Sequence, residues 1–233
     1  MTESEYRQKV EEAKSIVFFG GAGVSTESGI PDFRSADGLY NQKYYVAPEI
    51  ILSAEYFWAN TDKFFEFYFD RMIYKDAKPN AAHIKLAQWE KQGKLAAVVT
   101  QNIDGLHQAA GSERVYELHG SVHRNTCARC GKKYGLDDIL KQSPHTPRCE
   151  CGGVIKPDVV LYGESLPERT VVSAINAIAN ADMLIVGGTS LAVYPAAGFI
   201  RYFGGSRDNL IVINKTHIDG FPNQLNGSIS EIL

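Results

Sequence analysis

The sequence predicts an α/β fold, a doubly wound, Rossmann-like parallel sheet with two smaller additions. Short apolar runs alternate with helical patterns along most of the 233 residues, which is typical of strands joined by crossover helices. Two segments break this alternation: residues 47–78 are rich in aromatic side chains, and residues 122–156 hold all four cysteines. We therefore expect a Rossmann-like domain (1–46, 79–121 and 157–233), a helical insertion (47–78) and a small zinc-binding ribbon (122–156).

Six apolar runs are expected to form the strands of the sheet. The first, residues 15–19, stops at Gly20 and Gly21, and a strand buried in a parallel sheet is apolar along its whole length. The others are residues 95–100, 115–118, 159–162, 183–188 and 210–214. Their carboxyl ends should lie at one edge of the sheet, where such folds bind ligands.

Helical patterns separate these runs at residues 80–92, 167–180 and 194–203. Asn80 is a suitable N-cap for the first of them and Gly93 a suitable stop. The polar N-terminal segment is also expected to be helical, with Thr2 and Glu5 forming a capping box. Within residues 47–78 the aromatic side chains recur at roughly helical spacing, and we expect them to fill a core.

The composition argues against several classes of function. A net charge of −3 lacks the basic excess of a protein that binds phosphate backbones, so we expect no direct nucleic-acid binding. No apolar run approaches the roughly 20 residues of a membrane helix, and the N-terminus does not resemble a signal peptide. We expect a cytoplasmic protein with no membrane partner, where reducing conditions favour metal binding by cysteines over disulfides.

The four cysteines form two close pairs with metal-ligand spacing. Two residues separate Cys127 from Cys130, and one residue separates Cys149 from Cys151. Two such pairs can supply four thiolates to one tetrahedral zinc ion, and a site closed by four cysteines is structural rather than catalytic. A redox pair would need a thiol of low pKa beside a strand–helix unit, which nothing in this segment indicates.

Two glycine turns and one asparagine suggest a dinucleotide site. Gly20, Gly21 and Gly23 follow the first strand, where glycines let a backbone approach a pyrophosphate. The turn at residues 187–190 offers another phosphate cradle, and Asn214 could donate a hydrogen bond to a ribose. The usual glycine spacing is only partly met, and no acidic residue follows a second strand, which weakens a dehydrogenase interpretation. The alternative is that these turns are merely structural.

Polar side chains at two other strand ends suggest chemistry. Gln101, Asn102 and Asp104 follow one buried strand directly, and His119 ends another beside Gly120. Histidine is the usual general base near neutral pH. Single histidines are more often structural, but the strand end and the adjacent glycine favour His119 as the base. His83 and His107 lie on helical patterns and are expected to pack or cap.

Taken together, these motifs resemble the sirtuins, which are NAD-dependent protein lysine deacylases, in their bacterial cytoplasmic form. The resemblance runs from about residue 15 to the end of the chain. It rests on residues 21–35 (GAGVSTESGIPDFRS), 100–107 (TQNIDGLH), 117–120 (ELHG), 188–191 (GTSL) and 212–214 (VIN), with the cysteine pairs between the third and fourth of these.

The resemblance implies a role for each matching residue. His119 would be the base that deprotonates a ribose hydroxyl of NAD, and Asn102 would position that ribose or a water. The nicotinamide pocket would be formed by Phe33, Ile103 and Asp104. The remaining NAD contacts would be Gly21, Ala22, Gly23, Ser25, Thr26, Arg34, Gln101, Gly188, Thr189, Ser190, Asn214, Ser228 and Ile229. The segment between Asn214 and Ser228 is a few residues shorter than the family pattern.

The resemblance also implies the substrate. An acyl-lysine peptide would pair with the segment formed by Val160, Leu161, Tyr162, Gly163 and Glu164, with Val193 opposite. This is strand addition, in which backbone hydrogen bonds supply affinity without reading much sequence. The acyl group would pass from lysine to the ADP-ribose part of NAD as nicotinamide leaves.

Two residues bear on which acyl group is removed. Tyr68 and Arg71 have the Tyr-x-x-Arg spacing of sirtuins that remove acidic acyl groups such as succinyl. On a helix these residues share a face, so a phenol and a guanidinium could bind a carboxylate. Aromatic-rich helices also carry this spacing by chance, so we expect acetyl as the main substrate, with desuccinylation as a secondary activity.

Three other functions remain to be weighed against deacetylation. One is mono-ADP-ribosyl transfer to a protein, against which the intact His119 argues. Another is a non-enzymatic NAD-sensing module, which would bind NAD without releasing nicotinamide. The last is an ordinary dehydrogenase, against which the Gln-Asn-x-Asp cluster argues.

Overall fold

The computed structural model describes residues 1–33, 38–39 and 45–233, and within them the predicted α/β class is confirmed. One sheet has the strand order β3-β2-β1-β7-β8-β9, and each neighbouring pair is parallel. Its strands are β1 (Ile16–Gly20), β2 (Leu95–Thr100), β3 (Val115–Glu117), β7 (Met183–Gly187), β8 (Leu210–Asn214) and β9 (Gln224–Asn226). The chain builds the sheet outward in both directions from β1 and β7, so the topological switch point lies between these two strands.

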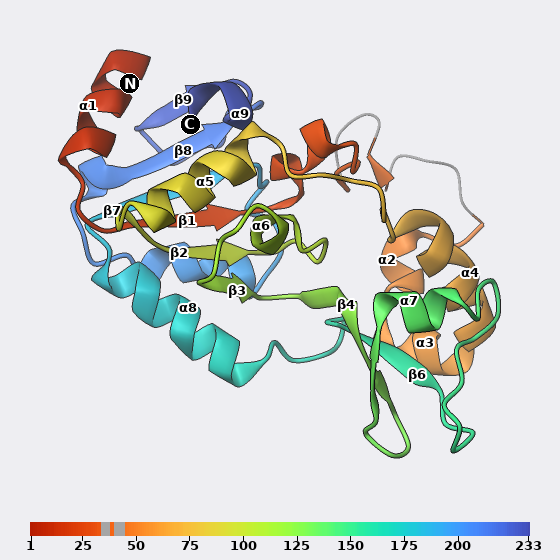
Figure 1. Cartoon of the computed structure of the whole chain (residues 1–233). Helices are drawn as coiled ribbons and strands as arrows, with labels where there is room; N and C mark the ends of the chain where they lie inside the picture. Colours follow the sequence, from red (N-terminus) through yellow and green to blue (C-terminus); the bar gives the residue numbers. More distant parts are fainter. Residues whose placement is uncertain (34–37, 40–44) are drawn as a thin grey trace.

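Successive residues of β1 serve two different cores, as the pleat of a strand requires. Ile16 and Phe18 pack with α5 (Ala81–Lys91), whereas Val17 and Phe19 pack with α8 (Glu168–Asn180). Figure 1 shows α5 and α8 on opposite faces of the sheet. Each face is closed by further elements: α1 (Glu3–Glu12) and α9 (Ile229–Ile232) on the α5 side, and the 3₁₀ helix η4 (Ala196–Tyr202) on the α8 side.

The helix signals in the sequence mark real helix ends. The Asn80 side chain accepts hydrogen bonds from the backbone amides of Ala82 and His83, and Gly93 has a φ of +74° just after the last turn of α5. Thr2 and Glu5 form the predicted capping box of α1. The pattern at residues 194–203 does form a helix, but of the 3₁₀ type.

A second, three-stranded sheet of order β5-β4-β6 extends away from the first. It is antiparallel and consists of β4 (Gly120–Cys127), β5 (Lys133–Gly135) and β6 (Ile155–Val159), with α7 (Leu136–Leu140) beside it. The predicted strand at residues 159–162 is therefore wrong. Backbone hydrogen bonds turn the chain away at that point: Val160 donates to the His119 carbonyl, and Tyr162 donates to the Leu52 carbonyl.

The aromatic insertion folds into three helices, α2 (Pro48–Ile51), α3 (Ala54–Ala59) and α4 (Thr61–Arg71). Its aromatic side chains do fill a core: Phe57 meets Phe64 edge to face at 4.8 Å between ring centroids, and Tyr68 stacks on Phe64 at 5.5 Å. The same core contains Ile139 and Ile155 of the cysteine-bearing segment. The insertion and that segment therefore make one smaller lobe (Figure 1), and their sequence boundaries as domains stay a prediction.

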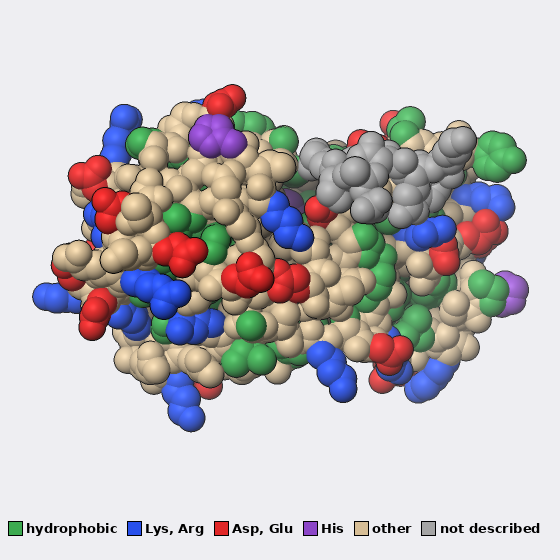
Figure 2. Space-filling view, turned by 90° about the horizontal axis from the view of Figure 1, so that it is seen from above, with side chains coloured by type: hydrophobic (Ala, Val, Ile, Leu, Met, Phe, Trp, Pro, Cys, Tyr) green, Lys and Arg blue, Asp and Glu red, His purple; other side chains and the backbone are tan. Residues whose placement is uncertain are grey.

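The described chain has four more short helices, which are η1 (Ala22–Val24), η2 (Thr26–Ser28), α6 (Leu106–Ala109) and η5 (Arg207–Asn209). Of these, η1, η2 and α6 follow β1 and β2 at the ligand edge, whereas η5 precedes β8 at the opposite edge. None of the helices that the structure describes has the length and apolar character needed to cross a bilayer. Figure 2 shows acidic and basic side chains intermixed over the face seen from above.

Candidate active site and metal centre

A cavity of about 1070 Å³ lies between the carboxyl edge of the parallel sheet and the smaller lobe. This volume is at the upper end of the range for small-molecule sites. Residues that follow β1, β2, β7 and β8 line it on one side, and residues of the smaller lobe line it on the other. Segments from widely separated parts of the chain thus meet at one space, where the fold class predicts a ligand.

The two glycine turns pack directly against each other at the floor of this cavity. The Gly21 amide donates to the Gly187 carbonyl at 3.2 Å, and the Gly23 amide donates to the Gly188 carbonyl at 2.8 Å. A Cβ atom on Gly23 would lie 2.8 Å from the Gly188 Cα, and Gly188 itself has a φ of +58°. Side chains are therefore excluded from both turns, which leaves a bare backbone surface that suits a pyrophosphate.

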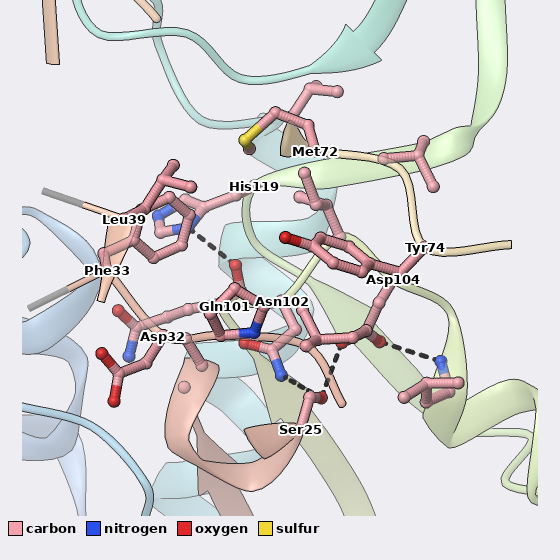
Figure 3. A pocket seen from close by; sticks show the side chains of 18 of the residues that line it. Ser25, Asp32, Phe33, Leu39, Met72, Tyr74, Gln101, Asn102, Asp104 and His119 are labelled. Carbon is pink, nitrogen blue, oxygen red and sulfur yellow. Dashed lines mark hydrogen bonds between the residues drawn. The ribbon is translucent and has the colours of Figure 1, made fainter. Parts of the chain in front are cut away.

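The polar residues after β2 form a fixed hydrogen-bond network with the first turn. Ser25 donates to Asp104 Oδ2 at 2.7 Å, and Asn102 Nδ2 donates to the Ser25 hydroxyl at 3.0 Å. The Leu106 amide donates to Asp104 Oδ1 at 2.9 Å, which places the carboxylate at the start of α6. Gln101 reaches the other turn, where its Nε2 donates to Thr189 Oγ1 at 3.1 Å. Figure 3 shows Asn102, Ser25 and Asp104 joined in this way.

His119 lies between β3 and β4 and lines the same cavity. Its Nδ1 is 3.0 Å from the Gln101 carbonyl oxygen, as Figure 3 shows. Because a carbonyl can only accept, Nδ1 carries the proton and Nε2 keeps its lone pair in the neutral ring. Burial lowers the pKa of His119 by more than the hydrogen bond to Gln101 raises it. The neutral ring that a general base requires is thus favoured.

The structure brings all three residues of the predicted nicotinamide pocket together. Phe33, Ile103 and Asp104 line the cavity, and the predicted NAD contact Arg34 lies outside the described residues. Sequence reasoning assigned no role to Asp32, Leu39, Met72, Tyr74 and His123, which also line it. Asp32 stands in the 21–35 motif and could have been found there. Met72 and Tyr74 follow α4 in a loop with no periodic signal, so only the fold places them around this space (Figure 3).

The predicted peptide segment forms another wall of the cavity. Val160, Leu161, Tyr162, Gly163 and Glu164 line it, and so does Val193. The Tyr162 ring is 40% exposed, so it lies at the rim.

The far end of the predicted NAD site is only partly assembled as expected. Asn214 and Ile229 line the cavity together with Thr26 and Ser190, and Ala22 lies in the first turn. Ser228 is not among the lining residues; its hydroxyl donates instead to the carboxylate of Glu27, which does line the cavity. The Ser228 side chain therefore ties the chain beside α9 to the loop after β1.

The predicted acyl-selectivity pair is not brought together at the cavity. Arg71 lines it and forms an ion pair with Asp70 at 2.5 Å. Tyr68 is buried in the aromatic core, where it stacks on Phe64, and it is not a lining residue. One turn of helix separates the two side chains, but the phenol faces the core because the aromatic stripe of α4 covers that face.

The four cysteine side chains converge as the spacing predicts. Their sulfur atoms all lie within 4.8 Å of one another. The Cys127 and Cys151 sulfurs are 3.5 Å apart, and those of Cys130 and Cys149 are 3.6 Å apart. A tetrahedral zinc ion with ligand bonds of about 2.3 Å requires sulfur separations of about 3.8 Å, so these four residues fit zinc.

Two features around the sulfurs support this fit. Tyr134 donates a hydrogen bond to Cys149 Sγ at 3.0 Å, and this bond lowers the pKa of the Cys149 thiol to about 6, toward the thiolate that a metal binds. A Cβ atom on Gly153 would lie 2.8 Å from the Cys127 sulfur, so the chain passes close to the cluster without filling it.

Comparison with known proteins agrees with this geometry. The model of the Sir2 family matches residues 21–195. An NAD-dependent protein deacetylase of Clostridium acetobutylicum is 59% identical over 216 residues, which cover 91% of this chain and 87% of that protein. One from Clostridium perfringens is 52% identical and covers 99% of this chain and 96% of its own length.

Solved structures agree as well. A complex described as Sir2, p53 peptide and NAD⁺ superposes with a TM-score of 0.87 at 37% identity, covering 99% of this chain and 95% of that one. A complex of a Sir2 variant with deacetylated p53 peptide and 3′-O-acetyl ADP-ribose superposes with a TM-score of 0.89 at 37% identity and the same coverage.

Proposed function

This chain belongs to the Sir2 family, the sirtuins, and from that premise we propose that it is an NAD-dependent protein lysine deacetylase. It removes the acetyl group from acetyl-lysine in a protein or peptide and releases nicotinamide and O-acetyl-ADP-ribose. The observation that carries this proposal is His119: its Nδ1 proton is held by the Gln101 carbonyl, and its ring lines a cavity shared by two bare glycine turns.

The residues around the cavity can hold NAD in a defined direction. The glycine turns at residues 21–23 and 187–188 offer backbone amides to the pyrophosphate, with Ala22, Ser25, Thr26, Thr189 and Ser190 beside them. Asn214 and Ile229 lie toward the adenosine end, whereas Phe33, Ile103 and Asp104 lie at the nicotinamide end. Ser228 contributes through its bond to Glu27 rather than by direct contact.

When bound, NAD supplies an electrophilic ribose carbon and a nicotinamide leaving group. The part of His119 is to take a proton from a ribose hydroxyl at Nε2, which needs the neutral ring. Asn102 is held by Ser25 and so presents an oriented amide to a ribose or water. Phe33 and the apolar side chains opposite it exclude water, and a dry pocket strengthens every polar contact within it.

Acetyl-lysine is the main substrate in this proposal. The wall formed by residues 160–164 and Val193 offers two edges between which an extended peptide can be inserted. Removal of longer acyl groups remains a secondary proposal, and the structure named for Sir2Tm bound to a propionylated peptide shows that a relative accommodates one extra carbon. For succinyl, Arg71 is the one member of the predicted pair that reaches the cavity.

Zinc has a structural role here, because four cysteine ligands leave no open coordination position. The ion would tie the turn after β4 to the loop before β6. We also propose a cytoplasmic location, supported by the need to keep four metal-binding thiols reduced.

The proposal is tested by mass spectrometry of an acetyl-lysine peptide incubated with the protein, with and without NAD. Loss of the acetyl mass only when NAD is present, together with O-acetyl-ADP-ribose, is the expected result. NAD consumption with ADP-ribose attached to protein would replace the proposal by ADP-ribosyl transfer. NAD binding without any reaction would leave a binding module.

A further inference from the structure

One lysine lies close behind the peptide wall of the cavity. The Lys156 side chain is 18% exposed, and it extends from β6 toward the segment at residues 160–164. Its Nζ atom donates to the Pro157 carbonyl at 3.2 Å, the Val159 carbonyl at 3.1 Å and Glu164 Oε2 at 3.1 Å. Each of the three N–H donors of the ammonium group thus has an acceptor.

The charge of Lys156 also has an aromatic partner. Its Nζ lies 5.9 Å from the centroid of the Phe57 ring, and Phe57 is fully buried in the core of the smaller lobe. Lys156 therefore links β6, the helical insertion and the peptide segment. A half-buried ammonium is costly to desolvate, so it is stable here only because these partners surround it.

Glu164 connects Lys156 to the backbone of the peptide segment. The same Oε2 atom that accepts from Lys156 accepts from the Leu161 amide at 2.9 Å, and the Glu164 amide donates to the Leu161 carbonyl at 2.9 Å. The carboxylate therefore closes the segment into a short turn. Its Oε2 atom is thus used within the protein.

The opposite side of the segment is fixed by main-chain hydrogen bonds. The Tyr162 amide donates to the Leu52 carbonyl and the Ala54 amide donates to the Tyr162 carbonyl, each at 2.9 Å. Val160 is fixed to His119 by a bond of the same length. The segment is thus held at three points: by the His119 carbonyl, by the helical insertion and by the Lys156–Glu164 pair. Only the last of these depends on side chains.

We propose that Lys156 is a positioning residue for the acyl-lysine peptide, acting through Glu164 on residues 160–164. The inference rests on the proposed deacetylase function. A peptide that binds by strand addition gains affinity from a preordered edge, because a loose edge must be ordered at the moment of binding. Loss of the pair should therefore weaken peptide binding and leave the chemical step unchanged.

The test compares steady-state kinetics of wild type and Lys156→Met with an acetyl-lysine peptide at saturating NAD. The expected result is a KM for the peptide that rises about tenfold, with kcat and the KM for NAD changed less than about twofold. Lys156→Arg should restore most of the affinity, since a guanidinium can donate to the same acceptors. Glu164→Gln should raise the peptide KM as well, and its effect should not add to that of Lys156→Met.

Lys133→Met is the matched control, because Lys133 belongs to the same sheet and pairs with Asp158 at 3.4 Å but is 73% exposed. It should leave all three constants unchanged. A peptide KM for Lys156→Met equal to that of wild type would overturn the inference. So would a loss confined to kcat, or additive effects of Lys156→Met and Glu164→Gln.

Hydrogen exchange separates this inference from the proposed function. In Lys156→Met the Leu161 amide should exchange faster than in wild type, whereas the amides of β1 should not change. That measurement requires no turnover. Absence of deacetylation by wild type would overturn the proposed function alone, and unchanged exchange at Leu161 would overturn the role of Lys156.

Discussion

His119 depends on one hydrogen bond for its chemical role. The Gln101 carbonyl fixes the proton on Nδ1, and the two residues come from the ends of neighbouring strands. The orientation and tautomer of His119 are therefore fixed by the pairing of β2 with β3, and not by another side chain. Because the acceptor is a backbone atom, no side-chain substitution removes the group that fixes this tautomer.

We predict that His119→Ala abolishes NAD-dependent deacetylation while the protein remains folded. The side chain supplies the only imidazole nitrogen assigned to the reaction, and its removal leaves the backbone bonds of the strands intact. Mass spectrometry of an acetyl-lysine peptide measures the loss, and circular dichroism checks the fold. His145→Ala, at an exposed position, should retain full activity. Turnover by His119→Ala near the wild-type rate would remove His119 from the role of base.

The activity should also report the lowered pKa of His119. The ring must be neutral to accept a proton, and burial shifts its pKa below the ordinary value of about 6.5. We therefore expect kcat/KM to stay on its plateau at pH 7 and to fall only below about pH 6.5. A pH–rate profile measures this acid limb. A limb above pH 7 would mean that His119 is stabilised in its charged form, contrary to its burial.

Residues of the site were predictable where they stand at a strand end within a motif. Asn102, Asp104 and His119 follow apolar runs directly, and their meeting at one edge follows from parallel strands. Tyr74 and Lys156 could not be predicted in the same way. Tyr74 stands in a loop without a periodic signal, and two of the three acceptors of Lys156 are backbone carbonyls, which leave no spacing pattern.

Among the elements, α5 and α6 share a buried pair of histidines beneath the site. The ring centroids of His83 and His107 are 4.7 Å apart, and both side chains are buried. His83 Nδ1 lies 2.9 Å from the Asn80 side chain, whereas neither ring nitrogen of His107 has a hydrogen-bond partner among the described residues. Burial is the main cause that lowers the pKa of His83 to about 4 and that of His107 to about 3.

The two buried histidines should therefore lower the free energy of unfolding in acid. In the unfolded chain both histidines bind a proton below about pH 6.5, whereas the folded state resists this until pH 3–4. The unfolded state binds more protons within that window, so the free energy of unfolding should fall as the pH drops from 6.5 toward 4. Urea unfolding at several pH values measures the slope. His107→Phe should flatten it, and His145→Ala should not; equal slopes for wild type and His107→Phe would contradict the prediction.

The cysteine-bearing segment should depend on its metal. Cys127→Ser removes one of the four ligands that join the turn after β4 to the loop before β6. We expect loss of zinc, measured by elemental analysis, and faster hydrogen exchange in β4 and β6. Lys132→Gln, which breaks a pair with Glu150 and a cation–π contact with Tyr134 but removes no ligand, should keep one zinc per chain. Full zinc content in Cys127→Ser would show that the site is not built from these four residues.

Elements were predictable where the apolar period was long and the boundaries were marked. The runs before Gly20 and Gly187 and the helix between Asn80 and Gly93 are of this kind. β9 escaped prediction because three residues are too few to show a period. The run at residues 159–162 misled because its apolar side chains face the cavity and the smaller lobe, so burial there does not require a strand.

For the whole molecule, the cavity joins two lobes that have separate cores. Core side chains of the sheet and those of the smaller lobe form distinct clusters, and the predicted NAD contacts belong mainly to the sheet. The class of the fold follows from the order of its elements. The way in which two inserted segments combine into one lobe does not, because it depends on how the aromatic side chains of residues 57–68 pack with apolar side chains of the cysteine-bearing segment.

NAD should stabilise the whole chain as a ligand of the folded state. At a concentration one hundred times its Kd, it should raise the free energy of unfolding by about 2.7 kcal/mol. Thermal unfolding with increasing NAD measures this as a rising Tm. His145→Ala should show the same rise, and Asn214→Ala a smaller one, because Asn214 lines the cavity at the end of β8. A Tm that does not depend on NAD would contradict the assigned site.

Within the described residues, the chain passes between the sheet and the smaller lobe three times: after α4, between β3 and β4, and after β6. The smaller lobe is therefore joined to the sheet by several connecting segments rather than by a single linker. A single proteolytic cut in one of these segments would leave the others to hold the two halves of the cavity together. Any widening of the cavity must therefore bend these connections together.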